Sequence, residues 1–207
     1  AGQLHIGIIP TIAPFVLPRL LPWLKKHHPK LELNVTEDLT ENIYQRLMLG
    51  KLDVLLLALP YELASTQTLA LFEDDFYLAC NNKTQFVSDP EHYSLSKIKN
   101  EAIVLLQDGH CLTEHAIDAC QIKRSDKISH ISPSTLQTLV QMINSDLGVS
   151  FLPALSVESN MLKNTHINVY KMAKRAYREI GLAWRQGSGR EAEFALLGQR
   201  VCEAMKK

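Results

Sequence analysis

Two cysteines, Cys111 and Cys120, lie nine positions apart in one short segment. A Gly-His pair precedes the first and suggests a loop, whereas the second lies in a stretch typical of a helix. If residues 112–120 are helical, nine steps of about 1.5 Å separate the pair by about 13 Å along the helix axis. Nine rotations of about 100°, one per residue, place the two cysteines on opposite faces. A disulfide requires Cα atoms within about 7 Å. The pair therefore cannot be helical and bonded at once, which suggests a thiol switch that must unwind to oxidise.

The same segment also offers four nitrogen and sulfur ligands that suit tetrahedral zinc. They are His110, Cys111, His115 and Cys120. Cys111 and His115 would lie one helical turn apart, but the opposite helical faces of the two cysteines weigh against a converging set. A zinc site stays open as an alternative, and the preferred interpretation includes no metal and no cofactor.

The position of Cys111 at the start of the expected helix favours nucleophilic chemistry. The thiolate is the reactive form of cysteine, and a helix N-terminus favours an anion. Cys80, inside an apolar run, and Cys202, on the closing helix, are interpreted instead as small buried side chains.

Composition excludes several classes of protein. The 207 residues include 22 basic and 22 acidic side chains, so no excess of positive charge points to nucleic acid or an anionic membrane. No apolar run reaches the length of a membrane span, and no signal peptide is recognisable. Four cysteines are too few for a disulfide scaffold and favour a reducing cytoplasm.

The first part of the chain alternates strand and helix patterns. The expected elements are a strand at Leu4–Ile9, a helix at Phe15–His28, a strand at Leu31–Thr36, a helix at Glu41–Leu49 and a strand at Val54–Leu59. Thr40 is the expected N-cap of the second helix. This order predicts an α/β fold with a parallel sheet.

A second series of elements follows. Strands are expected at Phe76–Cys80, Ala102–Leu106, Lys127–Ile131, Gly148–Leu152 and Ile180–Arg185, and helices at His110–Cys120, Ser134–Asn144 and Ala192–Met205. The cap of the helix at Ser134 is expected to be Ser134 or Ser132. A middle insertion with a C-terminal return predicts two lobes, residues 1–75 with 180–207 and residues 76–179. Each is expected to hold a mostly parallel sheet flanked by helices, with a ligand cleft at the carboxyl ends of the strands.

Several short motifs resemble the effector-binding domain of LysR-type transcriptional regulators. They are Ile9-Pro-Thr11, Leu49-Gly-Lys-Leu-Asp-Val54, Ser134-Thr-Leu136 and Gly148-Val-Ser-Phe-Leu-Pro153. The run Gly109-His-Cys111 with Cys120 nine residues on narrows the resemblance to the OxyR family of bacterial peroxide sensors. The resemblance extends from about Leu4 to Gly187.

The resemblance implies a two-lobed fold similar to periplasmic binding proteins and a transcriptional activator rather than an enzyme. Such domains form homodimers and homotetramers, to which the apolar first helix is expected to contribute. They act with RNA polymerase on antioxidant genes and are reset by thiol reductants of the glutaredoxin or thioredoxin type. DNA binding belongs to an N-terminal winged helix-turn-helix, which we expect to be missing because the chain opens at Ala1-Gly2 and reaches a strand almost at once.

The resemblance also assigns roles in peroxide chemistry. Cys111 takes the peroxidatic position and Cys120 the resolving position, and oxidation links them in an intramolecular disulfide. The residues expected to line the hydrogen peroxide pocket are Thr11, Thr40, His110, Glu114 and Arg178. Glu114 departs from the family, which often has Asp three residues after the peroxidatic cysteine.

Plainer interpretations exist for these residues. Thr11 and Thr40 are also suited to cap helices, Arg178 is by default a solvated charge, and His110 could be structural. A LysR-type domain that senses a small molecule and a peroxidase-like enzyme are the alternative functions.

Overall fold

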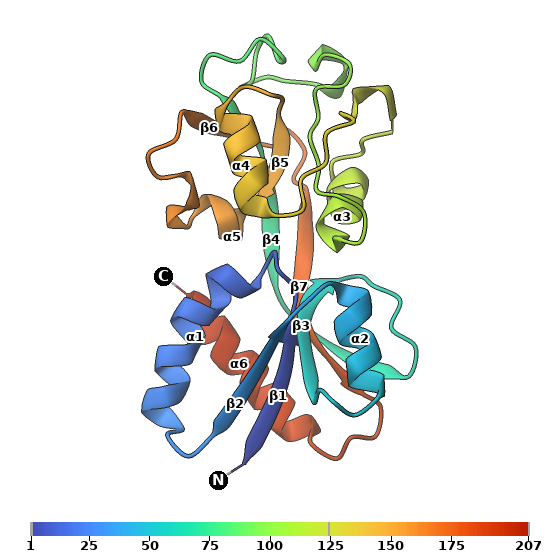
Figure 1. The fold of residues 1–207 in the computed structure, drawn as a ribbon, viewed down its shortest axis with the longest axis vertical. Coiled ribbons are helices and arrows are strands. Elements are labelled where there is room, and N and C mark those ends of the chain that lie inside the picture. Colours follow the sequence, from blue (N-terminus) through green and yellow to red (C-terminus); the bar gives the residue numbers. More distant parts are fainter. Residues whose placement is uncertain (1, 124, 207) are drawn as a thin grey trace. The chain divides into compact units, whose positions relative to one another are not determined.

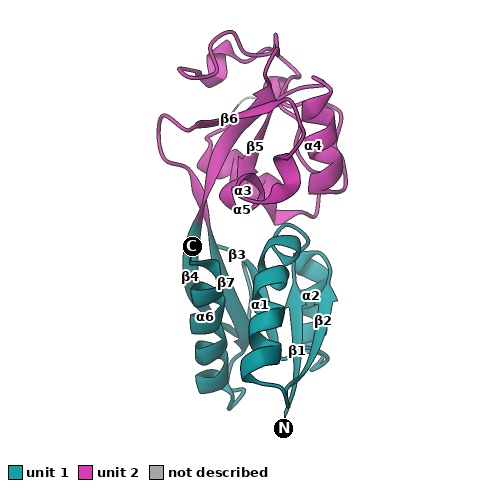
Figure 2. Cartoon of the chain, turned by 90° about the vertical axis from the view of Figure 1, so that its left-hand side faces the viewer, with its two compact units in different colours: residues 1–73, 179–207 teal, residues 74–178 magenta. Residues whose placement is uncertain are grey.

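The chain divides into two compact units. The computed structural model describes residues 2–123 and 125–206. Unit 1 contains the residues up to Glu73 and from Glu179 onward, and unit 2 contains Asp74–Arg178 (Figure 2). The chain passes between the units within two long strands, β4 (Thr66–Asn81) and β7 (Tyr177–Arg185) (Figure 1).

The sheet of unit 1 is mixed. Strands β1 (Gln3–Ile8) and β2 (Glu32–Glu37) pair in parallel, as do β1 and β3 (Val54–Leu59). Strand β7 runs antiparallel to β3, and the strand order is β2-β1-β3-β7-β4. All six residues of β3 are buried, as expected for an apolar strand in the middle of a covered sheet.

Three helices cover this sheet. Helices α1 (Ala13–His27) and α6 (Glu191–Met205) pack against each other on one face, and α2 (Thr40–Met48) lies on the other (Figure 1). The buried side chains of α1 recur at helical spacing, so its apolar stripe faces the core of unit 1.

Unit 2 is built around the second half of β4. Strands β5 (Ser150–Pro153) and β6 (Ile167–Lys171) both pair antiparallel with it. The helices are α3 (Cys111–Ala119), α4 (Leu136–Asn144) and the short α5 (Ala154–Val157), with 3-10 turns at Leu95–Lys97, Ser125–Lys127 and Asn160–Leu162.

The predicted two-lobed α/β fold is confirmed, but the strand directions in unit 2 differ from the prediction. Its named strands are antiparallel, and among the described residues of unit 2 the parallel pairing consists of isolated bridges from Ile103 to Ile128 and to Val149. The predicted strands at 102–106 and 127–131 are therefore wrong as continuous strands. Lys127 instead ends a 3-10 turn, and its ammonium group donates to the Ile98 carbonyl and to Asn100 Oδ1, which ties this stretch to a loop.

Two predicted helix caps are also wrong. Helix α2 begins at Thr40 itself, and the side chain of Asp38 accepts from the Leu39 N–H instead. Helix α4 is capped by Thr135, whose Oγ1 accepts from the Thr138 N–H at 3.1 Å, rather than by Ser132 or Ser134. Several hydroxyl residues in a row made the choice of cap ambiguous.

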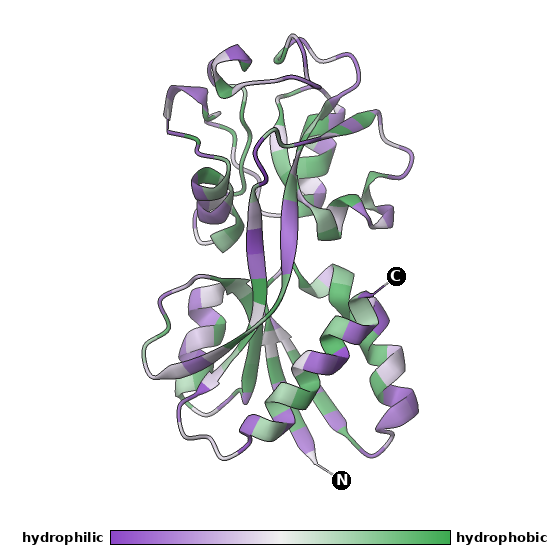
Figure 3. Ribbon diagram, turned by 180° about the vertical axis from the view of Figure 1, so that it is seen from behind, coloured by the Kyte–Doolittle hydropathy of each residue, from purple (hydrophilic) through white to green (hydrophobic). Residues whose placement is uncertain are grey.

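Both strands that connect the units carry a hydrophilic stretch (Figure 3). In β4 it coincides with the acidic run Glu73-Asp-Asp75. Within residues 2–123 and 125–206, no helix has the length and apolar character needed to cross a membrane.

Candidate functional site

Cys111 and Cys120 lie at opposite ends of one helix. Cys111 is the first residue of α3, and Cys120 directly follows its last residue. Both cysteines are in the thiol form rather than in a disulfide, and both are buried, with 5% and 6% of their residue surface exposed. A helix of this length holds the two residues about 13 Å apart along its axis.

The start of α3 is anchored by its own side chains and backbone. The Thr113 hydroxyl donates to the Leu106 carbonyl at 2.8 Å, and the Thr113 N–H donates to the His110 carbonyl at 3.0 Å. The side chain of the N-cap residue, His110, accepts no hydrogen bond from the first turn of the helix. The first N–H groups of a helix lack intrahelical partners, so this end suits an anion such as a thiolate at Cys111.

The surroundings of Cys120 disfavour its ionisation. Burial raises the pKa of this thiol to about 12. Burial raises the pKa of the nearby Tyr93 hydroxyl, and the proximity of Cys120 raises it further. The Tyr93 hydroxyl donates a hydrogen bond to the Met172 thioether sulfur. Cys120 is therefore held as a thiol in an apolar part of unit 2.

His110 is buried beside Cys111 in the sequence. Burial lowers the pKa of its imidazole, and a hydrogen bond with the backbone of Ser134 opposes that change only in part. The ring is consequently neutral at neutral pH, so it can exchange a hydrogen bond but supplies no positive charge to Cys111.

Arg178 is fully buried, in contrast to the solvated charge that is the default for an arginine. Its Nε and Nη2 both donate to Asp74 Oδ2 at 2.9 Å. The other carboxylate oxygen, Oδ1, accepts from the Leu155 N–H at 2.9 Å. Desolvation raises the pKa of Asp74, while Arg178 and the Leu155 N–H counter this. Removing one member of such a pair typically costs about 3–5 kcal/mol, because the other charge stays buried.

Thr11 and Thr40 occupy equivalent positions in unit 1. Each lies three residues beyond the end of a parallel strand, Thr11 after β1 and Thr40 after β2. Because the strands pair in register up to Ile8 and Glu37, both threonines lie at the carboxyl edge of this sheet. Both are buried, and Thr40 Oγ1 has no hydrogen-bond partner among the described residues. An unsatisfied buried hydroxyl at a strand edge is suited to a polar ligand.

The predicted pocket residues divide between the units. His110, Cys111, Glu114 and Arg178 belong to unit 2, and Thr11 and Thr40 belong to unit 1. Glu114 lies one turn after Cys111 on α3 and differs from the other five in being exposed.

The zinc alternative finds no support in the geometry. Across the described ranges 2–123 and 125–206, no group of three or more histidine, cysteine or acidic side chains is arranged to hold a metal ion. The two cysteines of the candidate set lie at opposite ends of α3, as helical spacing requires.

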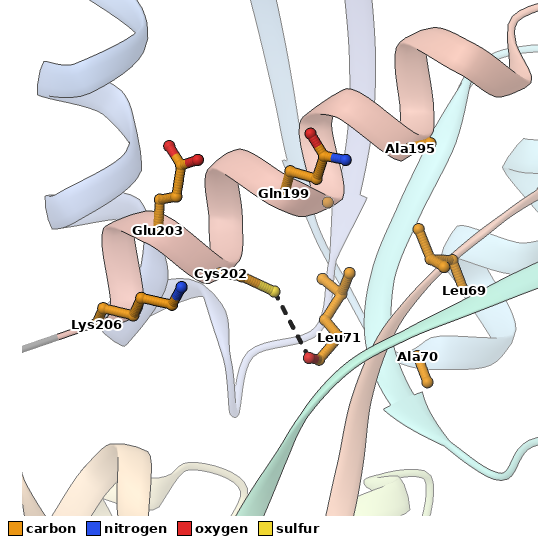
Figure 4. Close-up of a pocket in the computed structure, with 9 residues that line it drawn as sticks. Leu69, Ala70, Leu71, Ala195, Gln199, Cys202, Glu203 and Lys206 are labelled. Atoms are coloured by element: carbon orange, nitrogen blue, oxygen red, sulfur yellow. Dashed lines mark hydrogen bonds between the residues drawn. The ribbon is translucent and has the colours of Figure 1, made fainter.

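The two remaining cysteines lie elsewhere. Cys80 is fully buried in β4, and burial raises its pKa to about 11. Cys202 is half-buried on α6, and its Sγ donates to the Leu71 carbonyl at 3.5 Å, beside a cavity of about 370 Å³ in unit 1 (Figure 4).

Asp74 is the residue that the sequence reasoning missed. It lies in an acidic run within an otherwise exposed or half-buried part of β4, which is typical of a solvated surface. Its partner Arg178 is 104 positions away, so no local pattern connects them.

Comparisons with known proteins agree on one family. The profile described as LysR substrate binding domain matches residues 1–206. The HTH-type transcriptional regulator EstR of Acinetobacter baylyi is 35% identical over 197 residues, which are 95% of this chain and 65% of that protein. The chain spans about two thirds of the length of the curated relatives that it matches.

Solved structures are similar over nearly the whole chain. The reduced regulatory domain of OxyR2 from Vibrio vulnificus is 37% identical with a TM-score of 0.93, covering 99% of this chain and 96% of that one. A cysteine mutant of Corynebacterium glutamicum OxyR with hydrogen peroxide bound is 28% identical with a TM-score of 0.88, covering 99% of this chain and 65% of that one.

Proposed function

Because the chain belongs to the LysR substrate-binding domain family, whose members are parts of transcriptional regulators, we propose that it is a peroxide-sensing regulatory domain. One observation carries the proposal: two buried thiols that are not joined in a disulfide lie at opposite ends of the same helix α3. The similarity to OxyR regulatory domains, one of them bound to hydrogen peroxide, supports it.

The proposed reaction has two steps. The Cys111 thiolate attacks one oxygen of hydrogen peroxide, so that an S–O bond forms, the O–O bond breaks and hydroxide leaves, becoming water on protonation. The Cys120 sulfur then attacks the Cys111 sulfenic acid, an S–S bond forms, and the second oxygen leaves as water. Two thiols are oxidised and one peroxide is reduced to two waters.

The other pocket residues have proposed roles in the first step. The hydroxyls of Thr11 and Thr40 are suited to bind peroxide oxygens, and the Arg178 guanidinium is suited to stabilise the departing hydroxide. His110 acts as a neutral hydrogen-bonding group. Glu114, exposed one turn beyond Cys111, is assigned to the pocket on the family resemblance alone.

The wider biology is proposed on the same basis. Unit 1 and unit 2 correspond to regulatory subdomains I and II, with the redox cysteines in the second. We propose that the domain acts as a homodimer or homotetramer joined to a DNA-binding segment, activates antioxidant genes with RNA polymerase, and is reset in a reducing cytoplasm by glutaredoxin- or thioredoxin-type reductants.

Peptide mapping after one equivalent of hydrogen peroxide tests the central claim. We expect a single disulfide between Cys111 and Cys120. Either sulfur found unbonded after full oxidation would overturn the pairing.

Single variants test the order of events. Cys111→Ser should abolish the reaction, whereas Cys120→Ser should stop at a sulfenic acid that dimedone traps. Cys202→Ser is the matched control, since this half-buried thiol lies in the other unit and should leave the rate unchanged. No sulfenic acid in Cys120→Ser would contradict the assigned roles.

A turnover assay separates a sensor from an enzyme. With excess peroxide and thioredoxin, a sensor consumes peroxide slowly because each cycle requires α3 to unwind and refold. Sustained turnover at the rate of the first oxidation would favour a peroxidase.

The match to a family described as a substrate binding domain favours one further candidate, a domain that senses a small organic molecule. In that case Cys111 should react with peroxide no faster than an ordinary thiol. A thermal shift with a small ligand, unchanged in Cys111→Ser, would support this alternative.

A further inference from the structure

The buried pair of Asp74 and Arg178 lies where the chain crosses between the units. Asp74 is the first residue of unit 2 on β4, and Arg178 is its last residue, on β7. Their side chains are 1% and 0% exposed. Both carboxylate oxygens are used, Oδ2 by two guanidinium nitrogens and Oδ1 by the Leu155 N–H at the start of α5. The carboxylate is thus fixed by one backbone contact and in turn fixes one edge of the guanidinium.

A nearby ion pair joins Asp75 of β4 to Arg175, two residues before β7, and it shows what is unusual about the pair of Asp74 and Arg178. Asp75 and Arg175 are 2.8 Å apart, but their side chains are 36% and 59% exposed. An exposed pair of this kind is an ordinary surface contact. A buried ion pair is a poor source of stability, because apolar residues of similar size often serve as well. The buried pair therefore calls for a role other than holding the fold together.

We propose that Asp74 is a positioning residue, which holds the Arg178 guanidinium in the orientation that acts on peroxide at Cys111. This inference rests on the proposed peroxide chemistry. With Nε and Nη2 fixed on the carboxylate, the plane of the guanidinium is set, and so is the direction of its other N–H groups. A misplacement of about 1 Å in such a group can lower a rate by about a hundredfold.

A double-mutant cycle in the 207-residue chain tests the inference. All variants carry Cys120→Ser, so that the reaction stops at the sulfenic acid, and the second-order rate constant with hydrogen peroxide is measured. Asp74→Asn and Arg178→Gln should each lower it about tenfold or more. The double variant should be no slower than Arg178→Gln alone, because Asp74 acts through Arg178.

A second electrophile separates positioning from a structural role. Iodoacetamide alkylates the same Cys111 thiolate but has no oxygen–oxygen bond to align. Its rate should therefore stay within about twofold of the parent in Asp74→Asn, whereas general loosening of unit 2 would change both rates. Asp75→Asn is the matched control, since it removes the exposed carboxylate next in sequence and should change neither rate.

Two further variants serve as controls for loss of folding. Asp74→Glu keeps the charge but moves the carboxylate by one methylene. This variant should fold and should still react more slowly with peroxide than the parent does. The double variant removes both charges, so it leaves no unpaired buried charge.

Two outcomes would overturn this inference without affecting the proposed function. The first is that Asp74→Asn or Asp74→Glu reacts with peroxide as fast as the parent while Arg178→Gln reacts slowly. The second is that the rate losses of the two single variants add up in the double variant. If the parent itself reacts with peroxide no faster than a free thiol, the proposed function fails as well. That result is distinguishable because Arg178→Gln then also has no effect.

Discussion

The Cys120 thiol is protected by its surroundings, since burial raises its pKa to about 12. The thiolate is the nucleophile in alkylation, so few Cys120 side chains are reactive at neutral pH. We expect iodoacetamide to modify Cys120 at least about a hundredfold more slowly in the folded, reduced chain than in urea. Time courses of peptide masses give both rates, and the half-buried Cys202 is an internal control. Equal rates in the folded and unfolded chain would contradict the prediction.

His110 makes the stability of the fold depend on pH. Its folded pKa lies below the ordinary value of 6.5 because of burial, so the unfolded chain binds more protons as the pH falls. The free energy of unfolding should thus be fully retained above about pH 6.5 and fall below it, by at most about 1.4 kcal/mol per pH unit for one proton. Urea titrations from pH 7 to 5 should show a smaller loss in His110→Gln. An identical pH dependence in the two proteins would remove His110 as the cause.

Individual residues were predictable where the sequence placed the chemistry locally. The placement of Cys111 and Cys120 at opposite ends of one helix was predictable, because it follows from their spacing in a helical segment. The burial of Arg178 was not predictable, since it depends on Asp74, 104 positions earlier. The unsatisfied hydroxyl of Thr40 was hidden for a similar reason, because a threonine before a helix is typical of a cap.

Helix α3 has an unfavourable charge at its C-terminal end. Asp118, exposed in the last turn, opposes the negative end of the helix dipole. Asp118→Lys should stabilise α3 by roughly 0.3–1 kcal/mol or somewhat more. If disulfide formation requires this helix to unwind, the sulfenic acid at Cys111 should then persist about two to five times longer. Rapid-quench trapping with dimedone measures its lifetime.

Asp118→Asn is the matched control for this helix. It removes the unfavourable charge without adding a favourable one, so its effect should be intermediate. Unchanged sulfenic acid lifetimes in both variants, together with a measurable gain in stability, would show that α3 need not open before the disulfide forms.

Among the elements, long periodic segments were predictable and short pairings were not. The helices α1, α2, α4 and α6 lie within a few residues of their predicted ranges. Strand β6 was missed, and the strands expected at 102–106 and 127–131 form only bridges, because such pairings depend on partners far along the chain. The length of β4 was underestimated because the residues of its first half are half-buried or exposed, without the buried alternation of its second half.

At the scale of the whole molecule, we expect α1 and α6 to provide a surface for self-association. Leu21 on α1 is 40% exposed and Leu196 on α6 is 41% exposed, and the two helices pack together in unit 1. We expect Leu21→Glu to weaken the homodimer about tenfold or more, because a charge replaces an apolar contact. Leu49→Glu, at a position 71% exposed at the end of α2, should have no effect. Sedimentation equilibrium measures the dissociation constant of the homodimer for each protein. A wild-type chain that is monomeric at high concentration would refute the proposal.

The helix between the two cysteines also has a consequence in time. Under the proposed chemistry, a short pulse of peroxide marks Cys111, but the mark becomes a lasting disulfide only if α3 opens before a small thiol erases it. The domain then responds to the duration of the exposure as well as to its intensity. Brief fluctuations leave no record, and the stability of nine helical residues sets how long the cell must wait before it commits to a response.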